Sequence, residues 1–111
     1  MSTINILELA AKLLAQAREQ ASGRQSETIF GGHQHDLRQT LICLTEGKSL
    51  GEHQSPGEAT VQVIGGTIDI TAGDDTARLH AGDFYLIPPL RHSVAAVSDA
   101  SFLLTVATRG E

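Results

Sequence analysis

The chain has 111 residues, the length of one domain, and 41% of them are hydrophobic. Eight basic against 13 acidic residues give a formal net charge of −5 with no cluster of Lys and Arg, which argues against nucleic acid as a partner because binding phosphates needs concentrated basic charge. Aromatic residues are only 4% and tryptophan is absent, so the core is expected to consist of Val, Ile, Leu and Ala.

The single cysteine, Cys43, excludes a disulfide within the chain and is compatible with a reducing compartment. The first apolar run carries Glu8 and Lys12 and lacks the basic start of a signal peptide. No uncharged run approaches the length that spans a membrane. We therefore expect a cytoplasmic protein that does not bind membranes.

Residues 5–21 are predicted to form a helix that begins at Asn5. Asn5 followed by Glu8 is typical of a helix cap, because both side chains can satisfy free backbone N–H groups. Gly23 is expected to end the helix. One apolar stripe at helical spacing predicts packing on the barrel or on a second subunit; it comprises Ile6, Leu9, Ala10, Leu13, Leu14 and Ala17.

From residue 26 onward the pattern is that of short strands, which predicts a sandwich or a barrel. Gly65-Gly66 and residues 72–75 are predicted to be tight turns between strands. Residues 37–45 and 50–55 are expected to pair as a hairpin about Gly47. The remaining strands are expected at 26–30, 59–64, 67–71, 76–79, 84–87, 93–97 and 102–107.

Two stretches carry glycine, proline and histidine in the order of a known pair of motifs; the second is one residue short before its histidine, and Leu90 replaces its glycine. The first contains Gly47, His53 and Gly66, and the second contains Gly82, Pro88 and His92. On these residues the chain resembles the cupin superfamily over about residues 37–107. The resemblance implies a mainly all-β fold, a double-stranded β-helix or jelly-roll barrel with one N-terminal α-helix. It implies a helix and lead-in at 1–24 and a single cupin domain at 25–111.

Members of this family typically bind a divalent metal ion through two histidines and a glutamate of the first motif and one histidine of the second. The resemblance assigns His53 and His92 to two of these positions. Ser55 stands where the other histidine belongs, and Ala59 or Thr60 stands where the glutamate belongs. Two imidazoles alone hold a first-row metal weakly, because catalytic sites normally use at least three protein ligands.

A metal ion (Zn, Ni, Fe, Mn or Cu) would therefore need a further ligand. The candidates are Glu58, Gln62, His35 and Cys43, although Cys43 lies in an apolar run and is expected to be a small core residue. Without a metal, the two motif histidines would hydrogen-bond each other or a neighbouring hydroxyl.

The His33-Gln34-His35 stretch would place two rings on one face of a strand, but the flanking Gly31 and Gly32 favour a solvated loop. The expected hairpin about Gly47 would fold this end of the chain towards His53. It would bring His35, Arg38 and Gln39 to the mouth of a pocket.

Three functions remain open. The first is a cupin without catalysis that binds a small polar or anionic molecule. The second is a divalent-metal-dependent enzyme of the oxygenase or isomerase type, with His53 and His92 as ligands. The third is a dimeric sensor or stress-associated module, which a pocket filled by Leu90, Phe84 or Tyr85 would favour. The expected ligand pocket comprises His53, Ser55, Gln62, Tyr85, His92, Arg38 and Gln39.

We also expect a homodimer. Small members of the family commonly pair, and an exposed first strand would otherwise be an unprotected edge.

Overall fold

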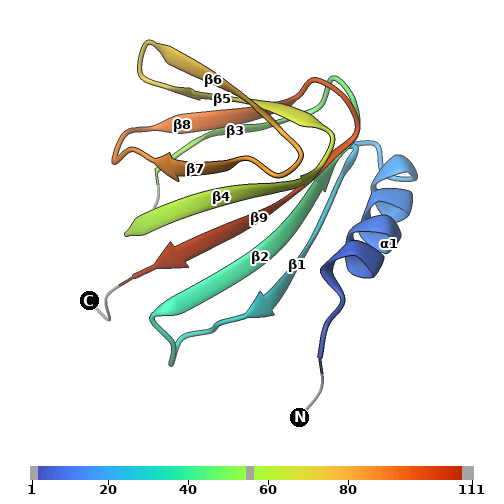
Figure 1. The fold of residues 1–111 in the computed structure, drawn as a ribbon, viewed down its shortest axis with the longest axis horizontal. Helices are drawn as coiled ribbons and strands as arrows, with labels where there is room; N and C mark the ends of the chain where they lie inside the picture. Colours follow the sequence, from blue (N-terminus) through green and yellow to red (C-terminus); the bar gives the residue numbers. More distant parts are fainter. Residues whose placement is uncertain (1–2, 55–56, 109–111) are drawn as a thin grey trace.

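The computed structural model describes residues 3–54 and 57–108 of the chain. These residues form one helix and nine strands (Figure 1). The helix is α1 (Ile6–Arg18), and the strands are β1 (Arg24–Phe30), β2 (Leu37–Leu44), β3 (Ser49–His53), β4 (Glu58–Gly65), β5 (Thr67–Ala72), β6 (Asp75–His80), β7 (Phe84–Ile87), β8 (His92–Ala96) and β9 (Ala100–Ala107). Every predicted element is present, and the bounds differ from the predicted ones in all of them except β7.

The strands form two antiparallel sheets that face each other. The larger sheet has the order β1-β2-β9-β4-β7, and the smaller has the order β3-β8-β5-β6. Helix α1 packs against β1 and β2, on the side of the larger sheet that faces away from the smaller one (Figure 1). The mainly all-β fold with one N-terminal helix is therefore as predicted. Within the two described ranges, no helix has the length and apolar content to cross a bilayer.

The larger sheet is buried on both faces where the helix covers it. In β2 the four consecutive residues Leu41–Leu44 are all buried. Ile42 and Leu44 join the core between the sheets, whereas Leu41 and Cys43 pack against the helix. Because successive side chains of a strand point to opposite faces, an unbroken apolar run is what a strand between two cores requires.

Helix α1 begins as predicted and ends earlier. The Asn5 side chain accepts a hydrogen bond from the backbone N–H of Glu8 at 2.9 Å, so the predicted cap is confirmed. The helix ends at Arg18 rather than at residue 21. The Arg18 guanidinium there donates two hydrogen bonds to the carboxylate of Asp99, at 3.0 and 3.2 Å.

The predicted hairpin about Gly47 is wrong. Strand β2 pairs with β1 and β9, and β3 pairs with β8 in the other sheet. Both edges of β2 are thus taken, and pairing with β8 lets Leu50 face Val94 at the core between the sheets. The turn around Gly47 carries the chain from one sheet to the other.

The turn at Gly65-Gly66 is present but also crosses between sheets, because β4 and β5 do not pair. Gly66 has φ +76°, and a Cβ there would collide with the backbone carbonyl oxygen of Asp99, so only glycine fits. The second predicted turn does form a hairpin, with Ala72 opposite Asp75 in the ladder between β5 and β6.

We expect Leu13→Ala to lower the free energy of unfolding by about 2–5 kcal/mol, because it leaves a cavity between helix and sheet. Leu13 is 2% exposed in the helix-side core. The matched control is Leu7→Ala, the same change on the same helix at a side chain that is 68% exposed, with an expected effect within about 0.5 kcal/mol. Urea unfolding followed by circular dichroism measures both. Equal losses would contradict the burial of Leu13 between α1 and the larger sheet.

Candidate functional site

The two motif histidines lie opposite each other on the neighbouring strands β3 and β8. Leu50 pairs with Val94, and His53 pairs with His92, with a register shift between these two pairs. An unbroken antiparallel ladder would place Glu52 opposite His92. The extra residue in β3 is therefore a β-bulge that presents an imidazole, rather than a carboxylate, to His92.

The two imidazole rings are in contact. Their centroids are 4.4 Å apart and their planes meet at 62°, an edge-to-face arrangement. His92 is 1% exposed and lies on the same face of β8 as the core residues Val94 and Ala96. His53 is exposed, so solvent reaches the pair from the β3 side.

Both rings are oriented by a backbone carbonyl two residues earlier in the chain. Nδ1 of His53 lies 3.0 Å from the carbonyl oxygen of Gly51, and Nδ1 of His92 lies 3.1 Å from that of Leu90. A carbonyl oxygen only accepts hydrogen bonds, so each Nδ1 carries the proton and donates it. The lone pair of each neutral ring is therefore on Nε2, and no hydrogen bond links either Nε2 to another of the described residues.

This orientation suits a metal ligand, but the described residues supply only two such ligands. A histidine that binds a metal usually donates its other ring N–H to a carbonyl or a carboxylate, as both rings do here. Among residues 3–54 and 57–108, however, no three His, Cys, Asp or Glu side chains converge on one point. The donor set that is described does not fit a catalytic centre with three protein ligands.

The candidates for a third ligand lie elsewhere. Glu58 and Gln62 are exposed on β4, on the face opposite to the core residues Val61 and Val63. His35 lies in the loop between β1 and β2, where its ring is 4.8 Å from that of Phe30. The thiol of Cys43 donates to the backbone carbonyl of Ala10 in the helix-side core, and burial raises its pKa to about 11. Cys43 is thus a core residue, as expected.

The other expected pocket residues are also dispersed. Tyr85 is half-buried on β7 and packs against the core between the sheets. Gln39 lies on the helix-side face of β2, where its amide donates to the Thr105 hydroxyl at 3.3 Å. Ser55 lies outside the described residues. Phe84 and Leu90 are exposed and do not fill the barrel. Two of the three side chains that would have favoured a sensor or stress-associated module therefore lie outside the barrel interior.

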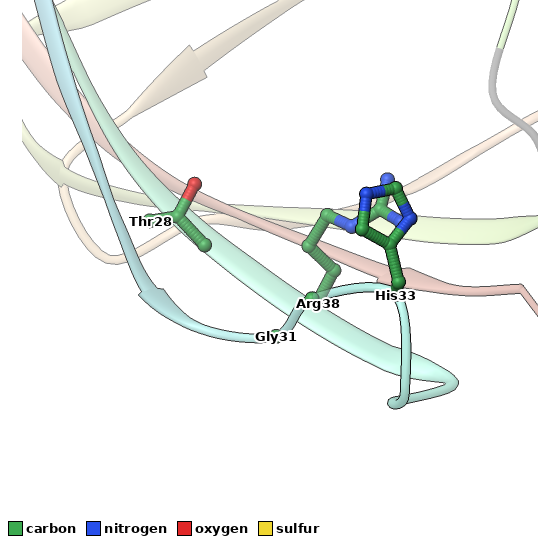
Figure 2. A pocket seen from close by; sticks show the side chains of 5 residues that line it. Thr28, Gly31, His33 and Arg38 are labelled. Atoms are coloured by element: carbon green, nitrogen blue, oxygen red, sulfur yellow. The ribbon is translucent and has the colours of Figure 1, made fainter.

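Arg38 faces the inner side of β2 but lines a different pocket. That pocket has a volume of about 430 Å³ and lies at the loop between β1 and β2, where Thr28, Gly31, Gly32 and His33 also line it (Figure 2). The sequence indicated this loop through Gly31-Gly32 and the neighbouring histidines. The contribution of Thr28 had no sequence signal, because it depends on β1 pairing with β2.

The carboxylates with shifted pKa values lie on other parts of the molecule. The Arg78 guanidinium, hydrogen-bonded at 2.9 and 3.0 Å, holds the pKa of Asp69 below its usual range. The backbone N–H of Glu46, and after it Arg18, lower the pKa of Asp99. Both carboxylates connect strands or turns, so their lowered pKa values result from contacts that stabilise the fold.

Comparisons with known proteins agree with this architecture. A family model described as "Cupin domain" matches residues 40–107. A conserved protein of unknown function from Streptococcus pyogenes is 32% identical over 96% of this chain and 95% of that one, with a TM-score of 0.72. An RmlC-like cupin from Shewanella frigidimarina is 18% identical over 79% of this chain and 78% of that one, with a TM-score of 0.70.

Salicylate 1,2-dioxygenase from Pseudoaminobacter salicylatoxidans, in a structure with gentisate adducts, has a TM-score of 0.77 and 18% identity. It matches 90% of this chain, which spans only 31% of that enzyme. At this identity the likeness shows the fold alone. No curated protein matches the sequence.

We expect the neutral rings of His53 and His92 to carry their proton on Nδ1, because Nδ1 of each ring faces a backbone carbonyl oxygen. Two-dimensional NMR spectra that correlate ring nitrogens with ring protons report the protonated nitrogen directly. The exposed His33 has no hydrogen bond to its ring within the described chain and is the internal control, expected to mix both tautomers. A proton on Nε2 of either motif histidine would contradict the hydrogen bonds from Nδ1 to the backbone carbonyls.

Proposed function

The chain belongs to the cupin family, and on that premise we propose that it binds a small polar molecule at the site where His53 and His92 meet. One observation carries the proposal: the two rings touch, and both donate Nδ1–H to backbone carbonyls. Each ring therefore offers a fixed Nε2 for a ligand, because its other nitrogen is already engaged.

The chemistry of the two rings defines the ligand class. A neutral Nε2 accepts a hydrogen bond from a hydroxyl, amide or ammonium group, and a protonated Nε2 donates one to a carboxylate. His53 is exposed and receives the ligand, whereas the buried His92 is held by its strand against the core. The pair suits a small molecule that carries a hydroxyl or carboxylate group.

The surroundings of the pair support binding rather than catalysis. A base that acts in catalysis is usually oriented by a carboxylate. The acidic neighbour on β3, Glu52, forms an exposed ion pair with Arg91 at 3.6 Å. Both rings are oriented by neutral backbone carbonyls instead.

A divalent-metal-dependent enzyme of the oxygenase or isomerase type is the second candidate. The Nδ1 hydrogen bonds favour it, because they leave two nitrogen lone pairs ready for a metal ion. It ranks second because the described residues add no third ligand to the two histidines. A bound metal would act as a Lewis acid or would activate oxygen.

The binding proposal predicts that His53→Ala weakens the binding of a ligand that has been identified by screening. Small hydroxy and carboxylic acids are screened by thermal shift, since a ligand at 100 times its Kd stabilises a protein by about 2.7 kcal/mol. Calorimetry is expected to show at least about tenfold weaker binding of the ligand to His53→Ala, from loss of a charged or polar hydrogen bond. His80→Ala removes an exposed histidine on β6 of the same sheet and is expected to leave the Kd unchanged. Equal affinity in His53→Ala would disprove the proposal.

Metal content separates the two candidates. Untagged protein and the His53→Ala, His92→Ala double variant are incubated with Mn, Fe, Ni, Cu or Zn salts, dialysed and measured by elemental analysis. With two ligands we expect well under one metal ion per chain after dialysis, because two imidazoles bind weakly. About one ion per chain, lost in the double variant, would favour the enzyme and show that a further ligand has joined the pair.

A further inference from the structure

A second site lies in the loop between β1 and β2, and neither His53 nor His92 lines it. The pocket of about 430 Å³ is lined by Thr28, Gly31, Gly32, His33 and Arg38. A smaller pocket of about 300 Å³ continues along the same loop to Gln34 and His35. Figure 2 shows that the side chains of His33 and Arg38 extend from the loop and from β2 on the same side.

Arg38 is a charged group without a carboxylate partner in the described part of the chain. The ion pairs there are Arg18–Asp99, Arg78–Asp69 and Arg91–Glu52. Arg38 is half-buried, on the same face of β2 as Ile42 and Leu44. A guanidinium stays charged at any physiological pH and presents a planar fork of donors. Half-buried and unpaired, it is suited to bind an anion.

The loop backbone fixes the stem of Arg38. Gly31 has φ +125°, and a Cβ on it would lie 2.9 Å from both Cα and Cγ of Arg38. The backbone at Gly31 therefore rests directly on the arginine stem, an approach that only glycine permits. The loop is closed by a hydrogen bond from the backbone N–H of His35 to the carbonyl of Gly32, at 3.1 Å. The contact between Gly31 and the arginine stem restricts the directions in which the Arg38 guanidinium can point.

The charge of the lining contrasts with that of the whole chain. The formal net charge of the protein is −5, yet the ionisable side chains that line this pocket are Arg38 and His33. The acidic residues nearest in sequence, Glu27 and Asp36, do not line it. Thr28, whose hydroxyl lies 3.2 Å from that of Thr40, adds a further polar group.

We propose that this pocket binds a small oxyanion, a carboxylate or phosphate group, with Arg38 as the principal donor and His33 and Thr28 beside it. Guanidinium groups pair with both kinds of oxyanion through two parallel hydrogen bonds. The proposal is independent of the histidine pair and would stand if that site bound nothing.

The test is an NMR titration of the full chain with inorganic phosphate and, in parallel, with acetate, against chloride at matched ionic strength. We expect saturable shifts of the backbone amides of Gly31 and Gly32 and of the Arg38 Nε–H. Arg38→Gln is expected to weaken binding at least about tenfold, because it removes the charged fork. Arg24→Gln removes the same charge from an exposed position on β1 outside the pocket, and less than about a twofold change is expected there.

Arg38→Lys serves if Arg38→Gln does not fold, because it keeps the charge and most of the stem. Loss of the fork is then expected to weaken binding several-fold. Saturation by phosphate, by acetate or by both supports the proposal and identifies the group. No saturable shift with either anion, or equal weakening in Arg38→Gln and Arg24→Gln, overturns it. Shifts centred on His53 and His92, abolished by His53→Ala, would also overturn it while supporting the function proposed for the histidine pair.

Discussion

The central constraint on this fold is that the larger sheet must be covered on both faces. Strand β2 carries four consecutive buried residues, Leu41–Leu44, and only half of them can face the smaller sheet. Helix α1 covers the other half, with Leu13 and Ala17 buried against the sheet. Asp99 helps to hold this layer in place, because its carboxylate accepts from Arg18 at the helix end and from the backbone N–H of Glu46. One side chain thus links the helix to two turns that cross between the sheets.

The positions of the elements could be predicted from the sequence, but the pairing of the strands could not. Alternating apolar residues and glycine turns are local signals, and they indicated the helix and all the strands. Pairing depends on residues that are distant along the chain. Gly47 and Gly65-Gly66 resemble hairpin turns locally, yet both turns lead from one sheet to the other. Burial determines which strands pair: β2 lies between β1 and β9, and β3 pairs with β8.

In the candidate sites too, some features could be predicted from the sequence and others depend on contacts between distant residues. Motif spacing identified His53 and His92 as candidates, and the structure brings their rings into contact. The side of β4 on which Gln62 lies could have been predicted from the sequence, because the apolar residues Ala59, Val61 and Val63 alternate along that strand and face the core. Gln62 alternates with these residues and therefore lies on the exposed face of the strand. The pocket around Arg38, by contrast, depends on a glycine resting on the arginine stem, a contact that no spacing rule encodes.

The bulge in β3 makes the chemistry of the histidine pair sensitive to chain length. Inserting one residue between Leu50 and Glu52, with the bulge kept, would bring the Glu52 carboxylate opposite His92. A pair of nitrogen bases would become an acid–base couple, with one oxygen donor and one nitrogen donor, although every other residue stayed the same. Diversification at this position can therefore proceed by insertion, because one added residue in β3 changes which side chain faces His92.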